Sequence, residues 1–441
     1  MSKIAALVII ALFALTGCDN SALPLPISTP VPSSTVESSP TTATPTREEV
    51  VRIQLPDSML QDLLDEHHLA YPDPFSQEYP DILAVPVMVH YSADCLYYRS
   101  FEEMPFVGEK YSMTVPEEVN ENLYEYNLST REKIKIGDVS SSGYSSGNSL
   151  FTKDTFYTFS STSQNALVIR GLDLESGKTQ EIAQIENGKI NVSFTQTDSG
   201  ICAFLVEIEN EGLNHQRLYT LNEEKNLKII YDSAQIGLEN PEFTALCSSD
   251  ENLFLLRQTS QSGRLSTEVV EMDINGTELR TILLPDLQEY SDPEYYADKL
   301  YVQGDYIFIK WYYCGERLPY FSAFKLVDGK ATEVAVPQNT PCYLLNDNPI
   351  NGRYFLFSTF PDMMDYTVNT YTSHLYIFDT QYDRFIGISL PLARDIVFND
   401  VVCNENGDII MNIVESTDSQ APSQKRTVRM AFDNLKSICQ L

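Results

Sequence analysis

Basic residues are scarce in this sequence. Its 441 residues include 30 Lys and Arg against 62 Asp and Glu, so the formal net charge at pH 7 is −32. A nucleic-acid-binding surface needs Lys and Arg to contact phosphates, and we therefore expect no nucleic-acid partner. The same charge argues against direct docking on anionic lipid. An acidic surface can bind cations or cationic partners, or serve solubility alone.

Motifs for catalysis are also lacking. The chain has five His, at positions 67, 68, 90, 215 and 374, and none has the spacing of metal ligands. We find no G-x-S-x-G, H-E-x-x-H, Walker or dinucleotide-binding motif. We therefore expect no metal, no cofactor, and a binding protein rather than an enzyme. Because carboxylates are abundant, an exported polysaccharide hydrolase or lyase with carboxylates in a central pocket stays open as the alternative.

Long hydrophobic runs are limited to the N-terminus. Ile4–Leu15 is apolar throughout, too short to span a bilayer, and follows the positive Lys3, as in a signal peptide. The sequence Leu15-Thr16-Gly17-Cys18 resembles the bacterial lipobox. The resemblance implies a signal peptide over residues 1–18, cleaved before a Cys18 that carries palmitate or a similar acyl chain. The other interpretation is an ordinary secretory signal in which Cys18 is incidental.

The lipobox implies a protein anchored by lipid to the cell membrane and facing its extracytoplasmic side. Residues 19–47 follow as a linker, and Pro, Ser and Thr supply 18 of the 26 residues of Ser21–Thr46. Such a composition cannot bury a core, so we expect this disordered linker to hold the folded domain away from the membrane.

Residues 48–80 are predicted to form a short extension. Glu48–Leu55, which contains VVRIQL, is predicted to form one strand. Ser58–Leu69 favours a short helix, since Ser58 and Gln61 have capping-box spacing and Leu60, Leu63, Leu64 and His67 share a face. The strand can add to a sheet edge, cap a face, or lie outside the main domain.

The remaining residues, 81–441, contain a repeat. Seven copies of an apolar strand, an Asp-like position, a polar turn and a second apolar strand recur about every 46 to 54 residues. The copies are Leu123–Ile136, Val168–Ile185, Arg217–Ile230, Val269–Leu283, Ser322–Val336, Ser373–Leu390 and Val428–Leu441. Two more strand-like runs precede each of several copies. Four strands in each of seven units predict an all-β fold, a seven-bladed β-propeller.

The last unit contains four strand-like runs, near 395–399, 408–415, 427–432 and 435–441. We therefore expect it to be complete without a strand borrowed from the N-terminus. The hairpins resemble TolB-type bacterial β-propeller repeats, with Val269–Leu283 as the nearest copy. The innermost-strand motif of that family is absent, so the resemblance implies the architecture and not a shared function.

The long irregular stretches fall mostly between the second and third strands of a blade, which places them on one face. They are Ser100–Asn122, Glu209–His215, Gln258–Ser266, Cys314–Tyr320, Pro361–Ser373 and Ser416–Lys425. Loop length gathered on one face is typical of a binding face. We expect a monomer that binds a cell-envelope protein, a peptide or a glycan there.

Aromatic residues and an Arg gather near two of these loops. The predicted ligand-binding residues are Trp311, Tyr312, Tyr313, Arg317, Tyr320, Tyr366 and Tyr371. Aromatic rings supply contact area at low entropic cost, and Arg adds direction. The alternative is that these rings pack the loops against the domain.

Seven cysteines besides Cys18 have irregular spacing, with no C-x-x-C and no zinc pattern, so we expect mostly buried thiols. One possible disulfide joins Cys314 to Cys342, because both are predicted at strand ends on the same side.

Overall fold

Short strands make up most of the described structure, as the apolar runs predict. The computed structural model describes residues 51–54, 65–67, 87–101, 118–119, 121–139, 141–142, 149–161, 166–210, 213–222, 224–236, 242–261, 264–285, 295–313, 321–337, 342–346, 348–358, 374–389, 396–415, 424–439 and 441. All of them belong to one unit formed by Val50–Val107 and Thr114–Leu441.

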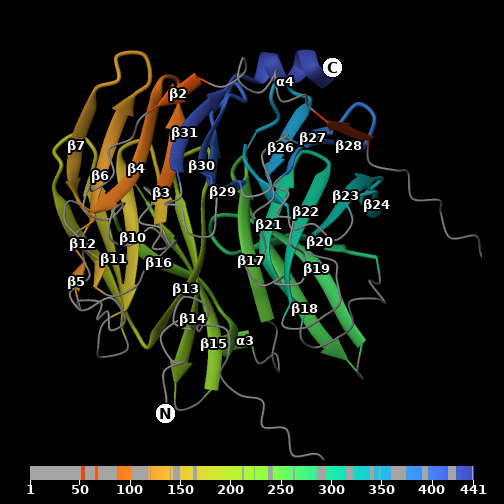
Figure 1. The fold of residues 1–441 in the computed structure, drawn as a ribbon. Helices are drawn as coiled ribbons and strands as arrows, with labels where there is room; N and C mark the ends of the chain where they lie inside the picture. The colour runs from red at the N-terminus through yellow and green to blue at the C-terminus, as the bar shows by residue number, and fades with distance from the viewer. Residues whose placement is uncertain are drawn as a thin grey trace, which may run out of the picture. The chain divides into compact units, whose positions relative to one another are not determined.

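Seven sheets, which we call blades 1 to 7, follow one another along the chain (Figure 1). Blades 1 to 3 are β3 (Val87–Ser92), β4 (Cys95–Phe101), β6 (Glu121–Asn127) and β7 (Lys133–Asp138); β9 (Ser149–Phe151), β10 (Thr155–Ser161), β11 (Ala166–Asp173) and β12 (Thr179–Glu186); β13 (Gly188–Gln196), β14 (Cys202–Asn210), β15 (Leu213–Leu221) and β16 (Leu227–Asp232). A short helix, α3 (Ser233–Ile236), follows blade 3.

Blades 4 to 6 have the same antiparallel order. They are β17 (Glu242–Ser249), β18 (Asn252–Gln261), β19 (Arg264–Met272) and β20 (Glu278–Leu283); β21 (Tyr295–Gln303), β22 (Tyr306–Tyr313), β23 (Phe321–Val327) and β24 (Lys330–Val334); β25 (Tyr343–Leu344), β26 (Tyr354–Ser358), β27 (His374–Asp379) and β28 (Arg384–Ser389). Blade 7 begins with β29 (Ile396–Cys403), β30 (Ile409–Glu415) and β31 (Gln424–Met430).

The blades form a closed ring. The first strands of several neighbouring blades contact one another, as β13 does β17 and β17 does β21, and β29 of blade 7 contacts β3 of blade 1. Figure 1 shows the blue seventh blade beside the orange first blade. The seven-bladed β-propeller predicted from the repeat is confirmed.

The ring closes with a strand from the N-terminal extension, and our expectation that blade 7 is complete without one is wrong. β2 (Asp65–His67) pairs antiparallel with β31, with Glu66 opposite Val428, and supplies the outermost strand. The predicted helix over Ser58–Leu69 is also wrong at these three residues. The free edge of β31 offers unpaired backbone N–H and C=O groups. Pairing with β2 satisfies several of these groups, which a short helix over the same residues would leave unpaired.

The C-terminal segment is a helix where a fourth strand was expected. α4 (Phe432–Cys439) places Phe432, Leu435 and Cys439 at helical spacing, and all three are buried against blades 6 and 7. Asp408 accepts a hydrogen bond from the Phe432 backbone N–H at 3.0 Å, which satisfies one of the free donors at the helix start. The aspartate at position 433 therefore opens a helix, although it resembles the turn residue of the other repeats.

The N-terminal extension also reaches blade 6. β1 (Val51–Gln54) pairs parallel with β28, with Val51 opposite Ile386, as a fifth strand at the outer edge. Of the three placements left open for this strand, addition to a sheet edge is the one observed. Figure 1 shows β1 beside β28 and β2 beside β31.

Apolar side chains fill the interfaces between neighbouring blades. The interface of blades 5 and 6 is rich in aromatic rings, with Phe308 within 5.5 Å of Phe355 and 5.2 Å of Phe357 between ring centroids. The interface of blades 1 and 2 has the smallest buried apolar cluster, Leu123, Val139, Phe156 and Leu172.

The two faces of the ring differ in how the strands connect. On one, here called the turn face, the first strand of a blade turns into the second and the third into the fourth. Many of these turns are stabilised by their own Asp or Asn, as at Asp273, whose carboxylate accepts the N–H of Asn275 at 2.9 Å and of Thr277 at 2.8 Å. These bonds lower the pKa of Asp273. The opposite face, the loop face, carries the connections between second and third strands and between blades.

Candidate ligand-binding face

The loop face differs from expectation in blades 3 and 4. Glu209–His215 and Gln258–Ser266 were expected to be loops, but the strand ladders continue through most of both. The last described pairs are Asn210 with Leu213 and Gln261 with Arg264. These two blades therefore present strand hairpins, visible as the β14–β15 and β18–β19 arrows at the bottom of Figure 1.

The predicted ligand-binding residues lie in three kinds of place. Trp311 is 1 % exposed and its indole N–H donates to Ser322 Oγ at 3.0 Å, so it is a core residue and its ring does not face solvent. Tyr312 and Tyr313 belong to β22 by their backbone pairing with β21. The other four, Arg317, Tyr320, Tyr366 and Tyr371, lie outside the described residues, as do Cys18 and the linker.

The predicted disulfide finds no support in the structure. Cys342 is a free thiol, and its side chain is completely buried between blades 5 and 6. Burial raises the pKa of this thiol strongly. Its suggested partner, Cys314, lies outside the described residues.

Sequence reasoning missed a polar cluster at the loop-face end of the interface between blades 1 and 2. Its members are Arg99 and Glu121 of blade 1 and Thr158, Ser160 and Arg170 of blade 2, and we call it the Arg99 cluster. Side chains alternate between the two sides of a strand. Arg99 and Glu121 therefore share the side of Leu123, and the blade 2 residues share the side of Phe156 and Leu172. Since these three apolar residues pack together, all five polar residues face one interface.

The Arg99 cluster combines burial with charge. Arg99 is 3 % exposed and Glu121 is 7 % exposed, and Arg99 Nη1 lies 3.3 Å from Glu121 Oε2. On the blade 2 side of the interface, Arg170 Nη1 donates to Ser160 Oγ at 2.8 Å. Burial raises the pKa of Glu121, against the lowering effect of the Arg99 charge. A single Arg within an aromatic strand, the sequence LYYRSF, was the signal that could have drawn attention to this position.

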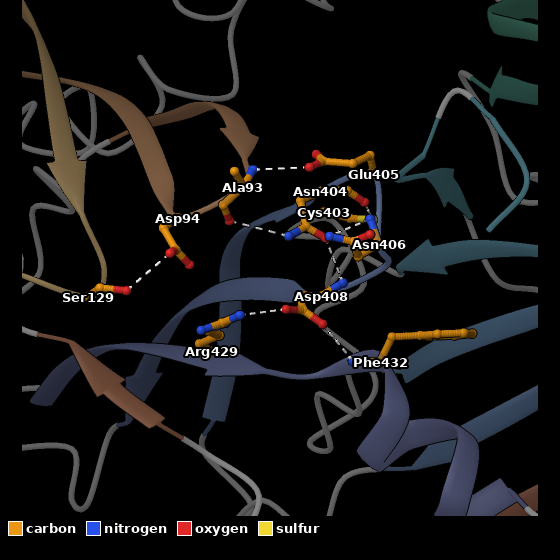
Figure 2. Close-up of polar contacts among 10 residues, drawn as sticks. All are labelled: Ala93, Asp94, Ser129, Cys403, Asn404, Glu405, Asn406, Asp408, Arg429 and Phe432. Carbon is orange, nitrogen blue, oxygen red and sulfur yellow. Dashed lines mark hydrogen bonds and ion pairs between the residues drawn. The ribbon is translucent and has the colours of Figure 1, made fainter. Parts of the chain in front are cut away.

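A second polar cluster lies on the turn face, where blade 7 meets blade 1 (Figure 2). The Ala93 N–H donates to Glu405 Oε1 at 3.3 Å, and the side-chain amide of Asn404 donates to the Ala93 carbonyl at 3.5 Å. Asn404 Oδ1 also accepts the N–H groups of Asn406 and Asp408, at 3.0 and 2.9 Å. These contacts tie the first turn of blade 1 to the first turn of blade 7.

The same cluster extends toward the helix α4. Arg429 Nη2 donates to Asp408 Oδ2 at 2.6 Å, while the other carboxylate oxygen of Asp408 holds the Phe432 N–H (Figure 2). Tyr91 is buried beside this pair, and its burial raises the tyrosine pKa to about 12. Most polar atoms drawn here already bond one another, although the Arg429 Nε and the Tyr91 hydroxyl are buried without a partner among the described residues. The turn-face cluster is therefore a fastening between blades, and the Arg99 cluster is the better candidate for binding.

Neither cluster resembles a metal centre. Within the described ranges, no three His, Cys, Asp or Glu side chains are grouped closely enough to hold a metal ion. The search for membrane-crossing helices, over the same part of the chain, found no helix with the length and hydrophobicity required.

The ring of blades and its two unlike faces define a β-propeller protein with one loop-bearing face. No protein-family model matches the chain, and no curated protein sequence matches it. Among solved structures, oligogalacturonate lyase from Vibrio parahaemolyticus is similar, with a TM-score of 0.41 and 13 % identity over 71 % of this chain and 86 % of that chain.

Two further solved structures show the same level of likeness. The propeller domain of the Trilobed protease from Pyrococcus furiosus has a TM-score of 0.45 and 10 % identity, over 78 % of this chain and 95 % of that chain. An uncharacterized protein of Listeria monocytogenes has a TM-score of 0.43 and 10 % identity, over 83 % and 95 %. Identities this low carry no information about activity.

Proposed function

We propose that this protein is an exported lipoprotein, acylated at Cys18, whose propeller binds a cell-envelope protein, a peptide or a glycan through its loop face. The observation that carries the binding part is the contrast between the faces. The described turns of the turn face are short, and their buried polar residues such as Asp379 and Asn404 bond within the turns, whereas Arg99, at a loop-face strand end, keeps a buried donor without a partner. In a rigid scaffold, ligand-binding groups are typical of the loop-bearing side.

The anchoring part of the proposal rests on the sequence. The apolar run Ile4–Leu15, the lipobox ending at Cys18 and the Pro-, Ser- and Thr-rich linker occur in the order that a tethered domain needs. The repeat type belongs to the proposal as well, because the β19–β20 hairpin resembles TolB-type bacterial repeats in its Asp273–Gly276 turn. Pairing of β1 and β2 with blades 6 and 7 would connect such a tether directly to the ring.

Anchoring is tested by replacing the thiol that would carry the lipid. We expect the full-length protein to incorporate labelled palmitate and to stay with the membrane fraction. The Cys18→Ser variant should lose the label and leave that fraction, while Cys95→Ser, a matched change within blade 1, should behave like the wild type. A labelled Cys18→Ser variant would contradict the proposal.

Binding is tested by thermal stabilisation of the full-length protein with peptides and neutral glycans, because a ligand of the folded state raises the melting temperature. Tyr320→Ala, in the chain segment between β22 and β23, should reduce the shift, and Tyr382→Ala, at an exposed turn-face position, should not. If no small ligand shifts the melting temperature, crosslinking in the envelope should identify a protein partner. Turnover of a polysaccharide would instead favour the hydrolase or lyase alternative.

The carboxylates described so far give that enzyme alternative less weight. Glycosidases need two carboxyl groups flanking the scissile bond. Glu121, the one described acidic side chain for which a raised pKa is resolved, contacts a guanidinium instead of a second carboxylate.

A further inference from the structure

Arg99 has hydrogen-bonding capacity that the described structure leaves unused. Its Nη1 contacts Glu121 at 3.3 Å, and its Nε, fully buried, has no hydrogen-bond partner among the described residues. A buried donor without a partner costs free energy, and buried charged groups are ordinarily paired and fully hydrogen-bonded. Such a donor therefore requires an explanation, of which a bound group is one.

The edge of this guanidinium that carries the unpaired Nε has a specific geometry. Nε and Nη2 lie on the same edge and donate in parallel, which is the arrangement that accepts both oxygens of a carboxylate. Glu121 contacts Nη1, so it does not form the bidentate contact with Nε and Nη2. The edge suits an added carboxylate better than a water molecule, because two parallel donors match two acceptor oxygens.

The charge of the Arg99 cluster also favours an anion. The cluster contains two guanidinium groups, Arg99 and Arg170, and one carboxyl group, Glu121, while the exposed Glu181 lies opposite Arg170 on the neighbouring strand. Burial favours the neutral form of Glu121, so the buried positive charge of Arg99 is less fully compensated. Within a protein that otherwise repels anions, this is a place where one would be attracted.

The backbone around the cluster connects the two blades at the same end. The ribbon of β5 (Glu118–Val119) and β8 (Ser141–Ser142) stands next to it, because β5 directly precedes β6 and β8 contacts β10 of blade 2. The Val139 N–H, just before β8, donates to the Glu121 carbonyl at 2.7 Å. The cluster thus lies between blades, at the loop face, beside a segment that spans both.

We propose that the Arg99 cluster is a binding site for a carboxylate group, held side-on by Arg99 and attracted by Arg170. The inference deepens the proposed function and rests on it, because it names the chemical class of ligand for the loop face. The carboxylate belongs to a sugar acid or to a peptide end, two sources that share this recognition chemistry.

The test titrates the full-length protein with glucuronate and with N-acetylglycine, at constant ionic strength, and follows the melting temperature. Glucose and N-acetylglycinamide, which lack the charge, are the matched ligand controls. We expect a saturable rise with at least one acid and none with its neutral counterpart. The acid with the lower Kd identifies the source of the carboxylate.

Three variants assign the effect to the cluster. Arg99→Gln should remove the shift, and Arg99→Lys, which keeps the charge but lacks the parallel donors, should weaken binding about tenfold. Glu121→Gln should tighten binding, because it removes a competitor for Arg99 and a negative charge. Arg257→Gln is the control: this half-buried Arg of blade 4 is already paired with Glu268 and Glu278, so its loss should lower stability and leave the ligand shift unchanged.

Each outcome decides the inference. A wild-type protein that shows no saturable shift with either acid, or an Arg99→Lys variant that binds as tightly as wild type, overturns it. If Arg99→Gln does not fold, two other variants test the inference: Glu121→Gln should bind the acid more tightly, and Arg170→Gln should bind it more weakly. A protein that responds to a neutral ligand but to neither acid would overturn this inference and leave the proposed function standing.

Discussion

Glu121 shows how one buried carboxyl group makes stability depend on pH. Burial raises its pKa above the unfolded value of 4.5, so the folded protein favours the protonated form. Its stabilising contribution is therefore present below pH 4.5 and is lost as the pH rises through the folded-state pKa.

We accordingly expect Glu121→Gln, which keeps the shape without the charge, to change relative stability with pH. In urea unfolding at pH 4.5 and pH 7, the free energy of unfolding of the wild type relative to the variant should be lower at pH 7. Gln258→Asn, a buried position of blade 4 without a titrating group, serves as the control. A constant difference between wild type and Glu121→Gln would contradict the assignment.

Gly407 holds the turn on which the turn-face cluster depends. Its φ is +85°, and an added Cβ would overlap Ile350 Cδ1 and lie 2.9 Å from Phe432 Cγ. We expect Gly407→Ala to lower the free energy of unfolding by about 3 kcal/mol, through backbone strain and crowding together. Gly304→Ala, at φ +56° with nothing within 4 Å, should cost about 1 kcal/mol in the same urea titration. Equal costs would mean that the crowding is unimportant.

At the scale of elements, helix α4 replaces a strand and covers the end of the interface between blades 6 and 7. Leu435 is fully buried there with Ile350 and Phe432. Leu435→Ala should lower the free energy of unfolding by about 3 kcal/mol, the usual cost of a cavity in a core. Ser437→Ala, on the exposed side of α4, should stay within about 0.5 kcal/mol. A Leu435→Ala variant as stable as Ser437→Ala would show that the helix does not contribute to the core.

The elements also show which structure could be predicted from the sequence. The hairpins were predictable because their signals are local: Asp273 and Gly276 form a turn whatever lies elsewhere in the chain. The strand β2 was not, because its pairing partner β31 is near the other end of the chain and only the ring brings them together. For the residues of helix α4 the sequence predicts a strand, because Asp433 occupies the position that the turn Asp has in the other repeats.

The candidate site follows the same rule. Arg99 is visible in the sequence as a charge within an aromatic strand, but its place beside Arg170 depends on the register of two strand pairs. The aromatic residue chosen from composition, Trp311, is buried because its single polar atom finds Ser322 inside the blade. The positions of the long irregular stretches predicted the loop face, and strand register was needed to find the charged residues at its edge.

At the scale of the whole molecule, stability depends on the N-terminal extension. β1 and β2 complete the outer edges of blades 6 and 7, so a variant lacking residues 47–68 leaves two strand edges open. We expect its melting temperature to fall by about 5 °C or more, since several ladder hydrogen bonds and their packing are lost together. Deletion of residues 21–46, which are Pro-, Ser- and Thr-rich, is the control and should leave the melting temperature unchanged.

The pairing of β2 with β31 also sets an order in time. A chain is made from its N-terminus, so β2 exists long before the strand it must join. Blades 1 to 5 can assemble from neighbouring strands as they emerge, but the seventh blade has to wait for the last residues of the chain. Such a late, long-range step is slow and leaves edges exposed while it is pending. The newly made protein therefore passes through an open arc of blades, the stage at which a chaperone would have most to protect.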